Sequence, residues 1–368
     1  MDAAPRRLDL ARYFLGLGTL GFGGPVALVE AMHRDLVERR AWISEAQYQR
    51  GMTLAQLCPG PLAAQLCFYV GYLQGRVAGA AVAGAMFILP SFAMVVGLGW
   101  AYQHFGGLPW MRAAFYGIGA AVVALIVKSA VRLGRKTIGR DPLLLGIGLA
   151  LAATTAATGR ESVLLVLAAG AALVLIRAPL LLVRRAGTLR EFGSGLILLK
   201  IAGLFAYGGA LVFGSGLAVV PFLHGRLVEG SQWLTESQFL DAVAVALITP
   251  GPVVIVAGFI GFLLASFIGA VVAVGATFLP AFLLTVVVTP HLERIAERTR
   301  LRVFVSGVTA AATGALAGAA ILFARQALAD LPTVTIALLA LSVGLLPFRI
   351  PDILIVVTAG IAGVVLRS

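Results

Sequence analysis

Charged side chains and cysteine are scarce in this sequence. Asp, Glu, Lys and Arg make up 12% of the 368 residues, about half the share found in a typical soluble domain. Hydrophobic residues make up 60%, and the mean hydropathy is +1.00. Apolar stretches of the about 20 residues that a helix needs to cross a bilayer recur along the chain. The sequence therefore excludes a soluble domain of useful size and predicts an all-α integral membrane protein.

The few cysteines and histidines form no metal-binding pattern. Cys58 and Cys67 are the two cysteines, and their separation of nine residues fits neither a redox pair nor a thiolate metal site. The four histidines are scattered without the spacing of a helical metal pair. The sequence also has no Gly-Lys-Ser/Thr phosphate-binding loop. We therefore expect no metal site, no cofactor and no ATP-driven mechanism.

The excess of basic residues points to a membrane rather than to nucleic acid. The formal net charge is +12, but the arginines and lysines stand in short blocks between apolar stretches, where they set the orientation of a membrane protein. Arg6 and Arg7 precede an apolar stretch without a small-residue cleavage site, which indicates a first span rather than a removed signal peptide. We expect a multi-pass protein of the inner (plasma) membrane, with lipid bilayer as its partner and no nucleic acid.

The sequence contains an internal repeat. Shifted by 191 positions, residues 22–61 align with residues 213–252 without a gap, and an offset of 190 continues the match further on. Both segments end in Pro-Gly-Pro, at residues 59–61 and 250–252. The sequence therefore predicts two homologous halves, residues 1–190 and 191–368.

The loops of the two halves differ in charge, and the difference predicts inverted orientation. Three arginines follow the first span and have uncharged counterparts in the second half: Arg34, Arg39 and Arg40 align with Gly225, Gly230 and Ser231. Further along, residues 294–300 are arginine-rich, whereas the equivalent residues 103–109 carry no arginine or lysine. Because basic loops stay in the cytoplasm, equivalent loops face opposite sides of the membrane.

Inversion requires an odd number of crossings in each half, and five fit the apolar stretches. The ten expected spans lie near 9–31, 76–103, 110–131, 142–159, 161–182, 193–221, 266–289, 303–325, 331–347 and 350–367. This places the basic loops at 33–50, 132–140, 183–190 and 291–302 in the cytoplasm and both termini outside.

Each half also has an apolar segment interrupted by Pro-Gly-Pro. Two prolines remove amide donors and disfavour helix before them, and the glycine supplies a joint. We expect two half-helices of about 12 residues in each segment, forming re-entrant hairpins that meet near the middle of the membrane. The second half-helix of each pair would direct its free amides at a cavity and attract an anion. The alternative is that Pro-Gly-Pro merely kinks a packed span.

Polar and backbone groups around these breaks form the predicted anion site. The predicted substrate-binding residues are Gln56, Pro59, Gly60, Pro61, Leu62, Ala63 and Gln65 at the first break, Thr249, Pro250, Gly251, Pro252, Val253 and Val254 at the second, and Phe22, Gly23, Gly24, Phe213, Gly214 and Ser215 at Gly-rich breaks in the preceding spans. Thr249 is also expected to cap the following half-helix. Second-rank candidates are Arg112, Arg302 and Lys200, for which anchoring at the interface is the alternative. Lys128 is expected to anchor a cytoplasmic helix end.

These motifs resemble those of the chromate ion transporter family. The chain has Phe-Gly-Gly-Pro at residues 22–25, a basic connector ending at Trp42, and Pro-Gly-Pro, and it repeats much of this pattern in the second half. The length is similar to that of the two-domain members. The resemblance implies chromate efflux that confers chromate resistance, with sulfate as a tetrahedral analogue. The sequence departs from the family pattern in its second half, where the counterpart of Phe-Gly-Gly-Pro reads Phe-Gly-Ser-Gly at residues 213–216.

Two other classes of function stay open at this stage. A membrane-embedded enzyme such as a lipid-phosphate hydrolase also pairs re-entrant hairpins, but it needs clustered acid, base and arginine residues near mid-depth. A passive channel would conduct without saturation. Gly- and Ala-rich stretches near 117–124 and 307–320 allow close helix approach, and from them we expect a homodimer.

Overall fold

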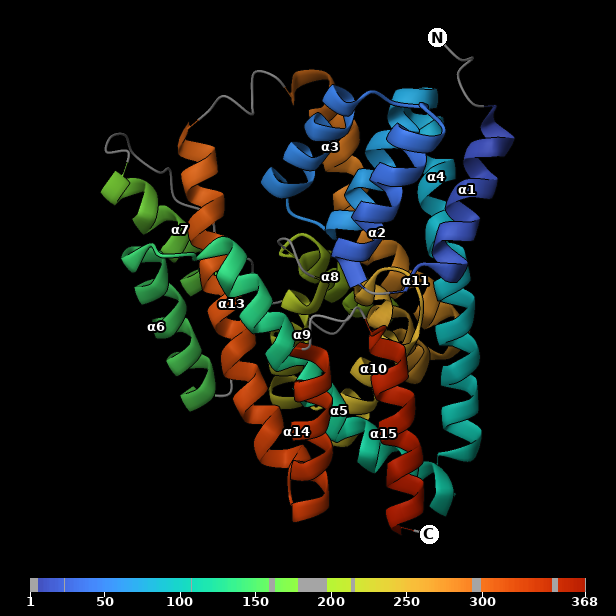
Figure 1. The fold of residues 1–368 in the computed structure, drawn as a ribbon, viewed down its shortest axis with the longest axis vertical. Helices are drawn as coiled ribbons and strands as arrows, with labels where there is room; N and C mark the ends of the chain where they lie inside the picture. The colour runs from blue at the N-terminus through green and yellow to red at the C-terminus, as the bar shows by residue number, and fades with distance from the viewer. Residues whose placement is uncertain are drawn as a thin grey trace.

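The structure is a computed structural model that describes residues 6–22, 24–106, 108–158, 163–177, 197–212, 216–292, 299–345 and 350–367. Within these ranges every regular element is a helix, as expected for an all-α protein (Figure 1). The helices of the first half are α1 (Arg7–Leu20), α2 (Gly24–His33), α3 (Glu45–Leu57), α4 (Leu62–Phe105), α5 (Pro109–Thr137), α6 (Pro142–Thr158) and α7 (Val163–Arg177). Those of the second half are α8 (Ile197–Gly209), α9 (Val219–His224), α10 (Glu236–Ile248), α11 (Val256–Val288), α13 (Thr299–Ala327), α14 (Leu331–Leu345) and α15 (Asp352–Arg367).

Local features recur at equivalent positions of the two halves. The connectors after α2 and α9 each form one wide helical turn, Arg34–Arg39 and Gly225–Gly230. α3 and α10 each start with a capping box, in which Ser44 or Thr235 exchanges hydrogen bonds with the residue three positions later. The sequence repeat is therefore also a repeat of structure.

The first expected span of each half is broken. The sequence predicts a span over 9–31 that contains a Gly-rich break, and α1 ends at Leu20 and α2 begins at Gly24. It predicts the same over 193–221, where α8 ends at Gly209 and the next helical turn begins at Gly216. Glycine stabilises a continuous helix poorly, and in the first half Pro25 then sits at the second position of α2, where its missing amide costs nothing.

α4 and α11 each combine two helices across a sharp reversal. In α4 the backbone leaves helical geometry at Gly75 and Arg76, which has φ +54°, and in α11 it does so at Ala265 and Ser266, with φ +52°. The expected starts of the spans at 76 and 266 are thus confirmed. The residues before each reversal form the second half-helix of a hairpin.

Four described helical segments are long and apolar enough to cross a membrane. They are Leu62–Phe105, Pro109–Thr137, Val253–His291 and Thr299–Ala327. α6, α7, α14 and α15 have 15 to 17 residues, fewer than the about 20 that a straight crossing needs. The chain is therefore a multi-pass membrane protein whose shorter helices pack around the long ones.

The two halves exchange their last two helices. α6 and α7 of the first half pack on α13, whereas α14 and α15 of the second half pack on α5. In Figure 1, α4 runs to the bottom edge, where α5 begins, whereas α11 ends at the top edge, close to the start of α13.

Small residues allow the exchanged helices to approach closely within this chain. A Cβ added to Gly117 would lie 2.0 Å from the carbonyl oxygen of Ala359, and one added to Gly314 would lie 2.0 Å from that of Gly148. Ala120, Ala121 and many neighbours are buried by the same packing. The Gly- and Ala-rich stretches near 117–124 and 307–320 are thus occupied by contacts within one chain, so they give no support to a homodimer.

Candidate functional site

Both Pro-Gly-Pro segments break the chain into paired half-helices, as predicted. α3 ends at Leu57 and α4 begins at Leu62, and in the second half α10 ends at Ile248 and a short 3-10 turn, Val253–Ile255, leads into α11. The central glycines have φ +144° and +98°. Side-chain-bearing residues rarely adopt such angles, which explains why each break has glycine at its centre.

Each Pro-Gly-Pro break is hydrogen-bonded to a break in the other half. The amide of Gly60 donates to the carbonyl oxygen of Val212 at 2.6 Å, and the amide of Gly251 donates to that of Gly21 at 3.0 Å. Gly21 and Val212 are equivalent in the repeat, and each follows the first helix of its half. The four breaks are therefore joined in two crossed pairs.

A second pair of equivalent residues packs on the two glycines. Ser91 of α4 is fully buried, and its hydroxyl donates to the carbonyl oxygen of Pro250 at 2.7 Å. A Cβ added to Gly251 would lie 2.2 Å from the Ser91 Oγ. The equivalent residue in α11 is Ala281, whose Cβ would lie 2.7 Å from a Cβ added to Gly60. Both breaks are thus packed too tightly to admit a side chain at the glycine.

Gln65 is the polar side chain at the first break. It is fully buried, and its amide nitrogen donates to the carbonyl oxygens of Cys58 at 3.2 Å and Pro59 at 2.8 Å. These carbonyls have no helical partners because they lie in the break, after α3 ends at Leu57. The Gln65 Oε1 atom is buried without a hydrogen-bond partner among the described residues. The first break therefore retains an acceptor that a donor group of a ligand can use.

The starts of the second half-helices present backbone rather than side chains to the break. Leu62, Ala63, Val253 and Val254 are apolar and buried, and neither half-helix start has a side-chain cap. The first amides of a helix lack partners within the helix and carry the positive end of its dipole. Thr249 does not supply a cap, contrary to our expectation, because its hydroxyl donates backward to the Val245 carbonyl oxygen at 2.7 Å.

Several predicted residues lie away from the breaks or outside the described part. Gln56 is exposed, although it is close to the first break in sequence, because it lies on the outer side of α3. Phe22 is 37% exposed and Gly24 starts α2. Gly23, Phe213, Gly214 and Ser215 lie outside the described residues. Of the predicted residues that the structure describes, the two Pro-Gly-Pro triplets, Gln65 and the half-helix starts lie at the Pro-Gly-Pro breaks, and Phe22 and Gly24 flank the break after α1.

The basic candidates are also placed elsewhere. Lys200 and Arg302 are exposed on α8 and at the start of α13, and Arg112 is exposed at the start of α5, where it lines a cavity described below. Contrary to our expectation, Lys128 does not anchor an exposed helix end. It is 8% exposed and forms a 2.6 Å ion pair with Asp352 at the start of α15, far away in sequence.

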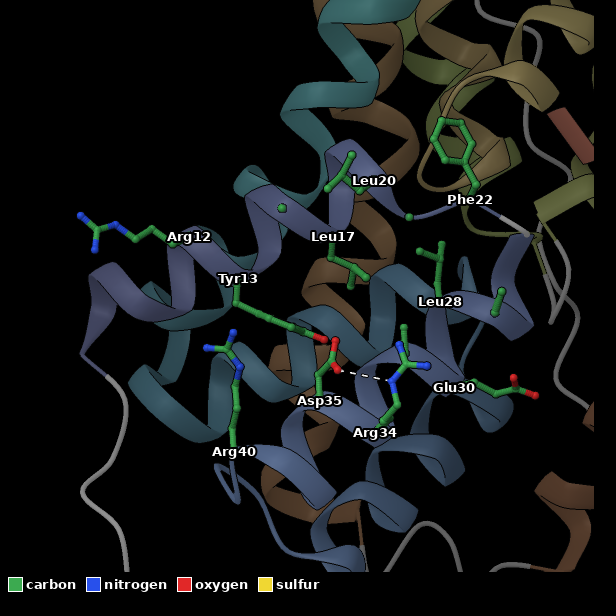
Figure 2. Close-up of a pocket in the computed structure, with 14 residues that line it drawn as sticks. Arg12, Tyr13, Leu17, Leu20, Phe22, Leu28, Glu30, Arg34, Asp35 and Arg40 are labelled. Carbon is green, nitrogen blue, oxygen red and sulfur yellow. Dashed lines mark ion pairs between the residues drawn. The ribbon is translucent and has the colours of Figure 1, made fainter. Parts of the chain in front are cut away.

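A cavity of about 570 Å³ lies between α1 and α2 and contains arginines that the sequence analysis assigned to orientation (Figure 2). Its lining includes Arg12, Arg34 and Arg40 together with Glu30 and Asp35. Figure 2 shows Arg34 beside Asp35, to which it is ion-paired at 3.5 Å, and Arg12 pointing away from them.

The same cavity reaches the crossed breaks. Leu20, Gly21 and Phe22 also line it, and the carbonyl of Gly21 accepts a hydrogen bond from the amide of Gly251. The Tyr13 hydroxyl is buried without a described hydrogen-bond partner, and the guanidinium of Arg40 lies 5.3 Å from the centre of the Tyr13 ring. The lining of this basic cavity thus includes one member of a crossed pair of breaks.

A second cavity, of about 730 Å³, lies at the opposite end of the molecule. It is lined by Tyr102, Gly106, Arg112, Phe115, Tyr116, Gly119, Glu236, Ser237, Leu240, Asp241, Gln326, Ala327, Ala329 and Arg367. These residues belong to the end of α4, the start of α5, the first turns of α10, the end of α13 with the turn after it, and the C-terminal end of α15. In Figure 1 the ends of α4 and α15 and the start of α5 lie at the bottom of the view. The Tyr102 hydroxyl donates to Asp241 Oδ2 at 2.6 Å.

Paired His and Glu residues hold the connectors in both halves. His33 lies 2.7 Å from Glu45, and His224 lies 2.6 Å from Glu236, the first residue of α10. His224 is buried against Phe239 and Phe323. These contacts attach the C-terminal end of α2 to the start of α3, and that of α9 to the start of α10.

The sequence matches known transport proteins along almost its whole length. The sequence profile of the family described as Chromate transporter matches residues 8–176 and 199–364. A "Probable chromate transport protein" of Synechococcus elongatus is 53% identical over 375 aligned residues, covering 98% of this chain and 95% of the relative. A "Chromate transport protein" of Cupriavidus metallidurans is 49% identical, covering 97% and 92%, and one of Pseudomonas aeruginosa is 32% identical, covering 95% and 90%. No solved structure matches the chain.

Proposed function

Since this chain belongs to the chromate transporter family, we propose that it is a secondary transporter that exports chromate across the inner membrane and thereby confers chromate resistance. The observation that carries the proposal is the crossed pairing of the breaks. Gly60 and Gly251 each bind the carbonyl that ends the first helix of the other half. Broken helices that meet near mid-membrane are the usual substrate site of transporters with inverted repeats.

The opposite directions of equivalent helices support inverted halves, residues 1–190 and 191–368. α4 and α11 end at opposite edges of the molecule in Figure 1, as inversion requires. The half-helix starts at Leu62–Ala63 and Val253–Val254 then approach the site with the positive ends of their dipoles. We propose that chromate, a tetrahedral dianion, binds between them, and that Gln65 fixes the shape of the first break by holding the Cys58 and Pro59 carbonyls.

The basic cavity at α1 and α2 supports entry of the anion from the cytoplasm. Arg34 and Arg40 lie on the connector that the sequence predicts to be cytoplasmic. A cleft lined by cations concentrates anions and speeds their association. Because Gly21 lines the cavity, the cavity gives an anion a path to one pair of crossed breaks.

The membrane potential supplies the driving force for export. The free energy of one elementary charge changes by about 2.3 kcal/mol when it crosses 100 mV, so that of a dianion falls by about 4.6 kcal/mol when it leaves a negative interior. This corresponds to a concentration ratio on the order of 10³. Potential-driven export of chromate therefore needs no ATP.

Labelled-chromate flux in proteoliposomes tests the proposal. A potential imposed with valinomycin should drive saturable chromate movement, and empty liposomes provide the background. Sulfate should compete, because it is a tetrahedral dianion of similar shape. If sulfate moves and chromate does not, the protein is a sulfate transporter, and if flux never saturates, it is a channel.

A lipid-phosphate hydrolase is the remaining alternative, and the described breaks do not favour it. Their side chains are Pro, Gly, Gln, Cys, Ser and Thr, whereas such an enzyme needs an acid, a base and an arginine together. The relatives named above are also transport proteins. Release of phosphate from a lipid phosphate by the purified protein would reverse this ranking.

A further inference from the structure

One buried carboxylate in the described part of the chain has no cationic partner. Three charged or titratable side chains are buried there apart from tyrosines and cysteines, and they are Lys128, His224 and Asp241. Lys128 pairs with Asp352, and His224 lies against Glu236. Asp241 is 8% exposed, and no described Lys, Arg or His lies within ion-pair distance of it. An ionisable side chain at such a position in a membrane protein is a candidate for proton transfer.

The surroundings of Asp241 allow it to exchange protons with one side of the membrane. Its carboxylate lines the 730 Å³ cavity at the end of the molecule that carries the C-terminus. Its hydrogen-bond donor is the hydroxyl of Tyr102 on α4, at 2.6 Å. By the predicted orientation this end faces outward, away from the basic connector after α2. Water in the cavity can therefore carry protons between Asp241 and the outside.

Other charged groups of the cavity have partners of their own or lie at its exposed rim. From α10, Glu236 lies 2.6 Å from His224. From α15, the Arg367 guanidinium lies 3.9 Å from the centre of the Tyr116 ring of α5. The remaining cation is Arg112, which is exposed at the start of α5.

The position of Asp241 along α10 connects this cavity with the second break. It lies eight residues before Thr249, about 12 Å along a helix that rises 1.5 Å per residue. The repeat places Arg50 of α3 at the equivalent position. α3 and α10 thus carry opposite charges at this position, and of the two only α10 has a proton acceptor there.

We propose that Asp241 is the proton-binding site that couples proton movement to chromate export, an inference that rests on the proposed function. Protonation of the carboxylate removes a negative charge from the helix that leads to the break, so the chromate dianion can occupy the break without repulsion from this side. The proton and the dianion therefore bind together from the cytoplasm, and both leave when the site opens outward. One proton accompanies each dianion, so one net negative charge still leaves the cell, and no covalent bond other than the carboxyl O–H forms or breaks.

Asp330 provides a matched control. Its carboxylate also accepts a 2.6 Å hydrogen bond from a tyrosine, Tyr116, but it lies in the exposed turn before α14. Hydrogen bonds from Tyr116 and Thr333 hold the pKa of Asp330 below its usual range, so it stays ionised at neutral pH. Asp330→Asn should leave proton coupling unchanged.

The experiment measures labelled chromate in proteoliposomes in two modes, with the potential held at zero. Chromate–chromate exchange reports on the anion path, and net movement driven by a pH gradient reports on coupling. We expect Asp241→Asn, which resembles the protonated carboxyl, to keep exchange and lose the pH-driven movement, while Asp330→Asn keeps both. The proposal would be overturned if Asp241→Asn kept the chromate movement that a pH gradient drives, or if this variant lost chromate–chromate exchange.

The wild-type protein separates failure of this inference from failure of the proposed function. Exchange without any response to the pH gradient would overturn coupling and leave chromate transport standing, whereas absence of exchange would overturn both. If Asp241→Asn does not fold, Tyr102→Phe provides a second variant. It removes a donor to the carboxylate, so the pH of half-maximal net movement should shift upward, and an unchanged pH profile would contradict the assignment.

Discussion

The substitution Gly251→Ala probes the packing of the second break most sharply. Its Cβ would lie 2.2 Å from the Ser91 Oγ, and position 251 has φ +98°. A side-chain-bearing residue held at a disallowed φ costs on the order of 1–3 kcal/mol. Forcing Ser91 aside in a packed interior costs a further 1–3 kcal/mol or so. We therefore expect Gly251→Ala to lower the free energy of unfolding by about 2–6 kcal/mol.

The double variant Gly251→Ala/Ser91→Ala divides this cost into its two causes. Removing the Ser91 hydroxyl relieves the overlap but leaves the strained backbone, and it also leaves the Pro250 carbonyl without its donor, which costs about 1 kcal/mol. The two substitutions should therefore be non-additive by about 0.5–3 kcal/mol, with the double variant more stable than the sum predicts. Ala281 already faces Gly60 at the equivalent place in the first half.

Equilibrium unfolding in mixed micelles, followed by circular dichroism, measures these differences. Gly275→Ala in α11 is the control, because a Cβ added there meets no atom within 4 Å and alanine suits a helix better than glycine. Gly275→Ala should not lose stability. A Gly251→Ala protein as stable as wild type, or strictly additive effects with Ser91→Ala, would refute the packing described for this break.

Three further predictions concern other parts of the molecule. Gln65→Leu leaves the Cys58 and Pro59 carbonyls without donors, so it should lower the free energy of unfolding by about 1–3 kcal/mol. It should also reduce chromate flux, measured by tracer uptake. A variant that is as stable and as active as wild type would contradict this prediction. Lys128→Met leaves the Asp352 carboxylate without its cation and should lower the free energy of unfolding by about 3–5 kcal/mol. The double variant Lys128→Met/Asp352→Asn should recover much of this loss in the same unfolding assay. Equal stability of the single and double variants would contradict this prediction. Replacing Arg34 and Arg40 by glutamine should slow chromate transport more at low than at high ionic strength, in flux assays over a salt series, whereas a salt-independent effect would argue against electrostatic attraction.

Local chemistry explains which parts of the site the sequence could predict. Two prolines and a glycine in an apolar segment disrupt a helix wherever they occur, so the paired half-helices were predictable from residues 58–61 and 249–252. The breaks near Gly21 and Val212 were also predictable from their Gly-rich segments, although the long apolar stretch around each one indicates one span. Length and hydropathy alone therefore overestimated the continuity of these helices.

Long-range pairing explains what the sequence could not predict. The contact of Gly60 with Val212 joins residues from different halves, and the ion pair of Lys128 with Asp352 joins residues more than 200 positions apart. Neither has a local pattern, because each depends on how the two halves pack. Asp241 was visible as an exception to the repeat, opposite Arg50, but its burial and cavity emerge only from the fold.

The central claim is that chromate passes between the two Pro-Gly-Pro breaks. The most direct test compares potential-driven flux of labelled chromate in proteoliposomes containing equal folded amounts of wild type, Pro61→Ala and Pro252→Ala. Each substitution allows the following half-helix to extend backward through the break. Both folded variants should lose most of the saturable flux. Wild-type flux in both variants would contradict it.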